Sequence, residues 1–441
     1  MTESRRARAA AAVPRGTGTV GAWLLFSGVA AYAFLAIANR ALGADEAAGL
    51  SALWALAFLV GPGACLPIEQ EVSRAIAARR SGGIGSGPVV RTATVAAATL
   101  AGILAVAALA AGPALVSDLF TDQVLLLAGF VALLVGYAGE YLVRGVFAGN
   151  ERFGPYGRLL GGEAVARVIG AAALAAAGVA AAGPYGLVVG IAPFVGIAVA
   201  LGRPADRHGL TPAGPPAPWH ELSRALGWLL AASLLAQVLV NAGPVLVQLL
   251  GGDRDEAETS RFLASLVIAR VPIFLFQAVQ AVYLPRLSGF AGQGAGEQLA
   301  SDLRRLGAAV CALCVVATVG AAILGPTVVR LAFGDEFALG RTDLAMLAAA
   351  SSIYLLALTL AQALIALRHQ PRVAFGWAAG VVGLVSGTFL STDVVRRVEL
   401  GYLLGSIAAT MAMGLLLLPA LRAARAGTTG PWITDSEGGA H

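Results

Sequence analysis

Apolar runs of about 20 residues recur along the whole chain, and each has the length that a helix needs to cross a bilayer. A helix rises about 1.5 Å per residue, so such a run covers a hydrocarbon core roughly 30 Å thick. Closed β-barrels are the only other spanning structure, and they show alternating strands rather than continuous runs rich in Ala, Leu, Val and Gly. The sequence therefore predicts an all-α integral membrane protein.

Breaks rich in Arg, Pro and Gly divide these runs into about twelve spans. They lie near 20–42, 47–68, 89–112, 123–143, 159–181, 184–202, 224–250, 261–285, 306–326, 343–367, 373–391 and 400–420. Only 12% of the 441 residues are charged, against roughly 25% in soluble domains. No soluble domain large enough to function alone is therefore expected.

The arginines gather in alternate connections, which predicts the orientation, because cytoplasmic connections carry an excess of positive charge. One set of connections includes Arg79, Arg80, Arg152 and Arg203, whereas the other set is acidic, as at Asp45 and Glu46. The expected location is the plasma membrane, and this pattern predicts that both termini lie in the cytoplasm. It also explains the net charge of +5 without a nucleic-acid partner, since no basic stretch is interleaved with aromatic residues.

A proline-rich stretch at 203–223 predicts an extended linker between two halves. The expected parts are a cytoplasmic tail at 1–19, a six-helix bundle at 20–202, the linker at 203–223, a second six-helix bundle at 224–421 and a tail at 422–441. A weak repeat supports the division, because GAWLL at 21–25 is echoed by LGWLL at 226–230. Two such halves have the same orientation and would be related by an axis along the membrane normal.

Arg270 is the strongest functional candidate, since it lies near the middle of its expected span and a charge there is expensive. A guanidinium binds phosphate in a bidentate manner, so an anionic lipid head group is one candidate partner. A structural ion pair with Glu140 or Glu163 is the alternative.

Two Glu–Arg pairs are spaced four residues apart, Glu140 with Arg144 and Glu163 with Arg167, so each pair shares one helix face. In the functional interpretation one of these carboxylates takes up the proton or sodium ion that drives transport. In the structural interpretation the pairs only reduce the free-energy cost of insertion.

Uncharged amides add polar groups to three spans. They are Asn39 beside Arg40, then Gln237, Asn241 and Gln248, and finally Gln277 and Gln280. Such groups serve either sugar hydroxyls or interhelical bonding, and bonding between helices is the commoner use.

The residues offer little to an enzyme. Asp253–Arg254–Asp255 resembles a metal-binding motif for nucleotide sugars, but the predicted orientation places it outside the cell. All four histidines fall in connections or the tail, and a chain without Lys has no Walker phosphate loop. We therefore expect no catalytic residue, no metal and no cofactor.

Three stretches resemble the polysaccharide-exporter branch of the multidrug/oligosaccharidyl-lipid/polysaccharide flippase superfamily, which includes lipid-linked oligosaccharide flippases. They are Leu66–Arg74, which looks like the exit of the second span in actinobacterial members, Arg144–Phe153 continuing to Glu163, and Ala269–Phe274 with Leu284–Ser288. This resemblance implies two six-helix bundles in a V around a central cavity. It also implies that Arg270 and Arg40 would meet a lipid diphosphate. The two further helices of lipid II flippases are missing.

The prediction is an alternating-access flippase that moves an undecaprenyl-diphosphate-linked oligosaccharide, or a related lipid-linked glycan, from the inner to the outer leaflet. Its partners would be that lipid, the bilayer and polysaccharide-assembly enzymes. The predicted substrate site contains Arg270, Arg40, Arg144, Asn241, Gln237 and Gln277, and the predicted ion-coupling residues are Glu140 and Glu163. A proton- or sodium-coupled multidrug exporter and a membrane glycan polymerase or ligase are the alternatives.

Overall fold

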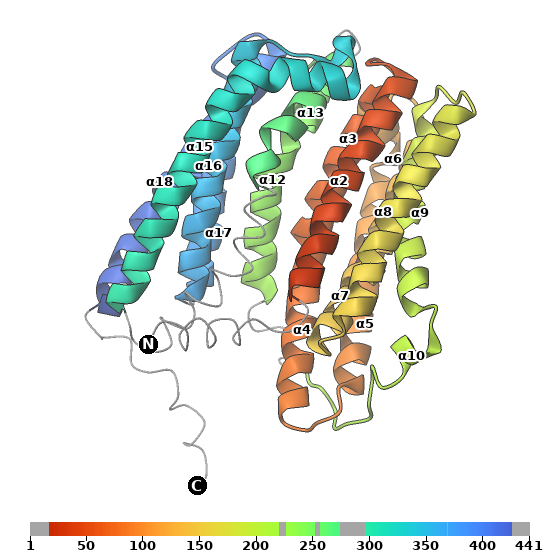
Figure 1. Cartoon of the computed structure of the whole chain (residues 1–441), viewed down its shortest axis with the longest axis vertical. Helices are drawn as coiled ribbons and strands as arrows, with labels where there is room; N and C mark the ends of the chain where they lie inside the picture. The colour runs from red at the N-terminus through yellow and green to blue at the C-terminus, as the bar shows by residue number, and fades with distance from the viewer. Residues whose placement is uncertain (1–16, 220–225, 252–255, 274–295, 368, 426–441) are drawn as a thin grey trace. The chain divides into compact units, whose positions relative to one another are not determined.

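The computed structural model describes residues 17–219, 226–251, 256–273, 296–367 and 369–425 (Figure 1). Every regular element in these ranges is helical, as the sequence predicts. The first elements are α2 (Thr17–Leu42), α3 (Ala47–Val60), α4 (Leu66–Ser81), α5 (Gly87–Ala110), α6 (Gly112–Ala114), α7 (Val124–Gly149), α8 (Phe153–Ala176), α9 (Ala182–Leu201) and α10 (Pro204–Arg207). They are followed by α12 (Leu226–Gly251), α13 (Glu256–Ala269), α15 (Gly296–Phe333), α16 (Arg341–Ala366), α17 (Gln370–Gly387) and α18 (Val394–Arg425).

Within the described residues, 10 helical stretches are long and apolar enough to cross a membrane. The chain is therefore a multi-pass membrane protein. Each of the 10 matches an expected span. The expected span at 261–285 continues past Ile273 and lies partly outside the described residues. The expected span at 373–391 corresponds to α17, whose polar first turn, Gln370–Pro371–Arg372, lowers the mean hydropathy of an 18-residue helix.

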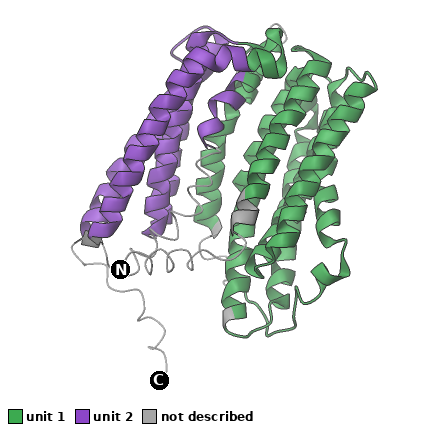
Figure 2. Ribbon diagram, viewed as in Figure 1, with its two compact units in different colours: residues 1–264, 329–338 green, residues 265–328, 339–441 purple. Residues whose placement is uncertain are grey.

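Two compact units make up the chain (Figure 2): residues 1–264 with 329–338, and residues 265–328 with 339–441. The first unit extends beyond the linker expected at 203–223, because α12 packs against α3 and belongs to this unit. Compactness reports packing rather than internal symmetry, so the two repeats of six helices stay a prediction.

The second span is one long helical rod with a bend in it. A π-helical turn, Gly61–Cys65, joins α3 to α4, and Pro62 lies at its start. Proline has no backbone N–H to donate, and a π-turn changes the hydrogen-bond register, so carbonyl groups are released at this point. Ser233 of α12 donates to the Pro62 carbonyl at 2.7 Å, which ties α12 to the bend.

The segment 203–219, called the strap below, is irregular after α10 but is bonded to the first unit. Arg79 is 7% exposed and donates to the carbonyls of Pro215 at 2.8 Å and Pro216 at 3.1 Å. The backbone N–H of Gly87 donates to the Pro212 carbonyl at 2.8 Å. The composition predicted an extended linker without a packed core; the strap is irregular after α10, and hydrogen bonds fix it on α4 and α5.

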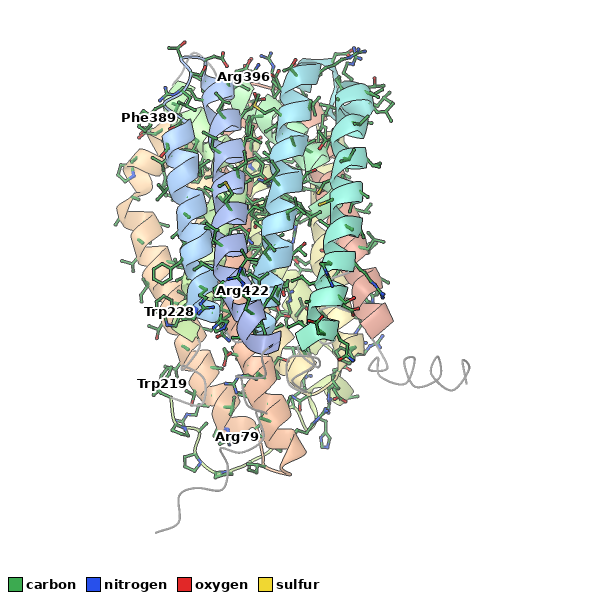
Figure 3. All side chains as sticks on the ribbon, turned by 90° about the vertical axis from the view of Figure 1, so that its left-hand side faces the viewer. Arg79, Trp219, Trp228, Phe389, Arg396 and Arg422 are labelled. Atoms are coloured by element: carbon green, nitrogen blue, oxygen red, sulfur yellow. The ribbon has the colours of Figure 1, made fainter. Side chains whose placement is uncertain are left out.

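Arg152 fixes the beginning of the strap in the same way. Its guanidinium donates to the carbonyls of Ala205, Asp206 and His208. Arg158 forms an ion pair with the Asp206 carboxylate. Figure 3 shows Arg79, which belongs to α4, and Trp219, which belongs to the strap, toward the same end of the first unit.

We predict that Arg79→Ala releases the strap, because the carbonyls of Pro215 and Pro216 lose their donor. Hydrogen bonds to charged groups are worth about 1.5 to 3 kcal/mol each, so amide hydrogen exchange in residues 205–219 should accelerate by at least about tenfold. Arg80→Ala is the matched control, since Arg80 is 42% exposed and pairs with an exposed Glu151. Equal exchange in the two variants would contradict a structural role for Arg79.

Candidate functional site

A group of buried charged residues occupies the first unit, with Arg144 of α7 at its centre. The Arg144 Nε lies 3.0 Å from the Glu69 carboxylate of α4, and both side chains are 11% exposed. Tyr156 of α8 completes the contact: its hydroxyl donates to Glu69 at 2.8 Å and accepts from Arg144 at 3.1 Å. The guanidinium also lies over the Tyr141 ring, 4.3 Å from its centroid. Three helices thus meet through one arginine.

Glu140 is a second carboxylate beside the same arginine. Its side chain is 1% exposed, and its nearer oxygen lies 3.7 Å from the Arg144 Nη1. The other oxygen, Oε2, is buried and has no hydrogen-bond partner. Burying a carboxylate oxygen that has no hydrogen-bond partner, called an unfilled oxygen below, costs free energy unless a proton or a cation binds to it.

The second Glu–Arg pair is also formed within its own helix. Arg167 pairs with Glu163 on α8, and the two side chains are 7% and 4% exposed. The Arg167 guanidinium lies 5.9 Å from the centroid of the Trp54 ring, and it interacts electrostatically with Glu140. The spacing of four residues predicted both pairs, and the structure contains both.

The charges of this group do not cancel. Three carboxylates, Glu69, Glu140 and Glu163, face two guanidiniums, Arg144 and Arg167. One negative charge is left among side chains that water hardly reaches. Chemically, such a group can bind one proton or one monovalent cation, and binding would neutralise it.

Arg270 belongs to the second unit and lies where α13 ends. The helix ends at Ala269, and Pro272 interrupts the backbone ladder two residues after Arg270. The 14 residues of α13 place Arg270 about 21 Å along the helix from Glu256. The side chain keeps part of its surface exposed.

Buried aromatic residues lie next to Arg270 within the second unit. Tyr354 lies 5.1 Å from Trp377 and 6.5 Å from Tyr402, measured between ring centroids. These three side chains are between 2% and 3% exposed. Tyr402 bonds to Ser351 at 3.3 Å and also interacts with Arg270. Arg270 therefore lies beside this buried aromatic cluster, through its interactions with Tyr402 and Tyr354.

Arg40 lies in the first unit and contacts backbone. Its guanidinium donates to the carbonyls of Leu331 and Ala332, at the end of α15. These carbonyls lack intrahelical partners, and a cation near a helix C-terminus is stabilising. Arg40 is exposed as a whole, but the bonds hold its guanidinium at the end of α15.

The predicted amides fall into two groups. Asn241 donates to Gln237 at 2.6 Å and to the Phe58 carbonyl at 3.4 Å, so both lie along the bend between α3 and α4. Gln277 lies outside the described residues. The substrate role assigned to these amides stays a prediction, while bonding between helices is observed for Asn241.

Sequence analysis missed Glu69 and Tyr156 as partners of Arg144. Glu69 falls one residue past the expected end of the second span, and Tyr156 falls three residues before the expected start of the fifth. Both helices run further than hydropathy indicated, α4 to Ser81 and α8 from Phe153. A polar helix end that other helices cover has no hydropathy signal of its own.

No family model matches the chain. An uncharacterized protein of Mycobacterium tuberculosis, Rv1510, is 26% identical over 358 residues, which cover 78% of each chain. An uncharacterized protein of Mycobacterium bovis, Mb3654, is 28% identical over 289 residues, which cover 63% of this chain and 64% of that protein.

Solved structures of transporters share the fold. An inward-facing multidrug resistance MATE family transporter of the MOP superfamily has a TM-score of 0.72 at 15% identity, covering 92% of this chain and 96% of that one. A point mutant of the Vibrio cholerae MATE transporter VcmN has a TM-score of 0.64 at 16% identity, covering 92% of this chain and 98% of that one. The chain therefore has the fold of MATE transporters of the MOP superfamily.

We predict that Arg144→Gln lowers the free energy of unfolding by about 3 to 5 kcal/mol, because it leaves two buried carboxylates without their cation. Arg74→Gln is the matched control: Arg74 also pairs with a glutamate on its own helix but is 55% exposed, so its loss should amount to less than about 1 kcal/mol. Denaturant unfolding of the full chain in micelles measures both.

A second substitution separates charge from packing in this test. Adding Glu69→Gln to Arg144→Gln should recover part of the lost stability, since it removes one of the unpaired charges. Simple additivity of the two changes would mean that the pair contributes only its packing.

Proposed function

We propose that the chain is an alternating-access transporter that moves a lipid-linked glycan, with an undecaprenyl-diphosphate carrier, from the inner to the outer leaflet of the plasma membrane. The MATE fold supports transport over catalysis. The orientation, with both termini in the cytoplasm, is the one that the arginine distribution predicts.

The placement of Arg270 is the observation that carries this proposal. The residue as a whole is partly exposed, directly follows the end of α13 and interacts with Tyr402, which lies beside Tyr354. A guanidinium is always charged and presents donors in a fork that matches phosphate oxygens. A diphosphate is the part of a lipid-linked sugar that such a group would bind.

Transfer of a fluorescent undecaprenyl-diphosphate sugar across proteoliposomes containing the full chain tests the proposal. The parent should transfer the lipid, and Arg270→Ala should slow transfer at least about tenfold, since hydrogen bonds to charged groups are worth about 1.5 to 3 kcal/mol each. Arg270→Lys should restore part of the rate, because it keeps the charge but not the fork.

Arg91→Gln is the control for general effects of losing a positive charge. Arg91 is exposed on α5 and belongs to neither group of candidate residues. Transfer that is absent from the parent, or unchanged by Arg270→Ala, would refute the flippase proposal.

A proton- or sodium-coupled multidrug exporter is the second candidate, and the excess carboxylate in the first unit favours it. Glu140 has an unfilled, buried oxygen that a proton or sodium ion would neutralise. If this candidate is right, the parent extrudes an amphipathic cation from proteoliposomes under a proton or sodium gradient, and Glu140→Gln abolishes the extrusion. Glu151→Gln is the control, since Glu151 is 61% exposed.

A further inference from the structure

A fully buried glutamate, Glu399, lies near the start of α18 in the second unit. The position escaped sequence analysis because it falls one residue before the expected span at 400–420. α18 packs against α17 and α16. A glycine contact brings two of these helices together: a Cβ added at Gly387 would lie 2.5 Å from the Cα of Gly401. This close packing, with α16 on the other side, leaves the Glu399 side chain 0% exposed.

One oxygen of Glu399 is occupied and the other is not. Oε2 accepts a hydrogen bond from Arg396 at 3.2 Å, one turn earlier on the same helix. Oε1 is buried and has no hydrogen-bond partner. Arg396 is 36% exposed, and its Nη1 also lies 3.7 Å from the Met346 sulfur. Figure 3 shows Arg396 at the opposite end of α18 from Arg422.

The charged groups around Glu399 are mostly acidic. Asp343 of α16 and Asp393, which precedes α18, both act on Glu399 electrostatically, and Arg396 opposes them. The neighbouring part of α17, Gly383–Gly387, carries no titratable side chain. Two other carboxylates and one guanidinium thus act on Glu399, whose second oxygen is buried without a hydrogen-bond partner.

We propose that Glu399 is a proton-binding site of the second unit. A proton would come from water at the partly exposed Arg396 end and add to Oε1, while Arg396 keeps its charge and nothing is oxidised or reduced. A calcium ion fits less well, because Ca²⁺ takes six to eight oxygen ligands and Glu399 offers one oxygen without a partner. Among the described residues, no group of three Asp, Glu, His or Cys side chains is placed to hold a metal ion.

Tyr402 connects this site to Arg270. It lies three residues after Glu399 and therefore on the same face of α18. Its hydroxyl donates to Ser351 of α16, and it interacts with Arg270. Protonation of Glu399 removes a negative charge one turn away from Tyr402, which would favour an anion at Arg270. This link rests on the proposed function, whereas proton binding at Glu399 does not.

Infrared difference titration of the full chain in lipid nanodiscs, from about pH 5 to about pH 9, tests proton binding directly without any transport assay. The parent should show carboxyl absorption that appears on acidification, and Glu399→Gln should lack the band due to Glu399, which the parent-minus-variant difference spectrum isolates from the carboxyls of the first unit. Glu297→Gln, an exposed carboxylate of the same unit, should keep the band.

Arg396→Gln keeps Glu399 and covers the case in which Glu399→Gln does not fold. It should move the appearance of the band to higher pH by at least about one unit, because an opposite charge within hydrogen-bonding distance is removed. Identical spectra of the parent and Glu399→Gln would refute the proposal. Loss of the band on replacing choline by sodium at constant pH would refute it too, by making the site a cation site.

Discussion

The need to give every backbone amide and carbonyl a partner in apolar surroundings determines most of this structure. Continuous helices meet that need internally. At helix breaks and ends, side chains supply the missing donors. Ser233 donates to the Pro62 carbonyl, Arg40 to carbonyls at the end of α15, and Arg79 to carbonyls of the strap. Polar side chains near a span are therefore often used by the backbone, even where their position resembles that of a ligand-binding group.

This constraint explains what the sequence could predict. The spans follow from hydropathy, because a helix in lipid must be apolar along nearly its whole length. The pairs Glu140–Arg144 and Glu163–Arg167 follow from the helical period alone. By contrast, Glu69 reaches Arg144 from another helix, and the burial of Glu399 depends on the glycine contact between α17 and α18. Contacts of this kind are tertiary, and a single sequence contains no local pattern for them.

In the part of the chain that the structure describes, each unit contains a buried carboxylate oxygen without a hydrogen-bond partner, on Glu140 in the first unit and on Glu399 in the second. In the first unit Arg144 serves both Glu69 and Glu140, and in the second Arg396 serves Glu399 beside two aspartates. A fully paired ion group can often be replaced by apolar side chains with no loss of stability. An unfilled carboxylate oxygen has no such structural use and adds a desolvation penalty. This penalty is the physical basis of the ion-binding roles proposed for Glu140 and Glu399.

The distribution of charge supports the proposed anionic substrate. The carboxylates of the first unit lie against arginines, and the one negative charge left over is buried, where a proton or small ion reaches it more readily than a bulky cationic drug. Arg270, by contrast, is partly exposed and lies beside uncharged aromatic residues. A guanidinium in this position repels an amphipathic cation and attracts a diphosphate, and desolvation strengthens both effects. Under the proposed function the carboxylates would bind the coupling ion and Arg270 would bind the substrate, so coupling and substrate selection would be carried by chemically distinct residues.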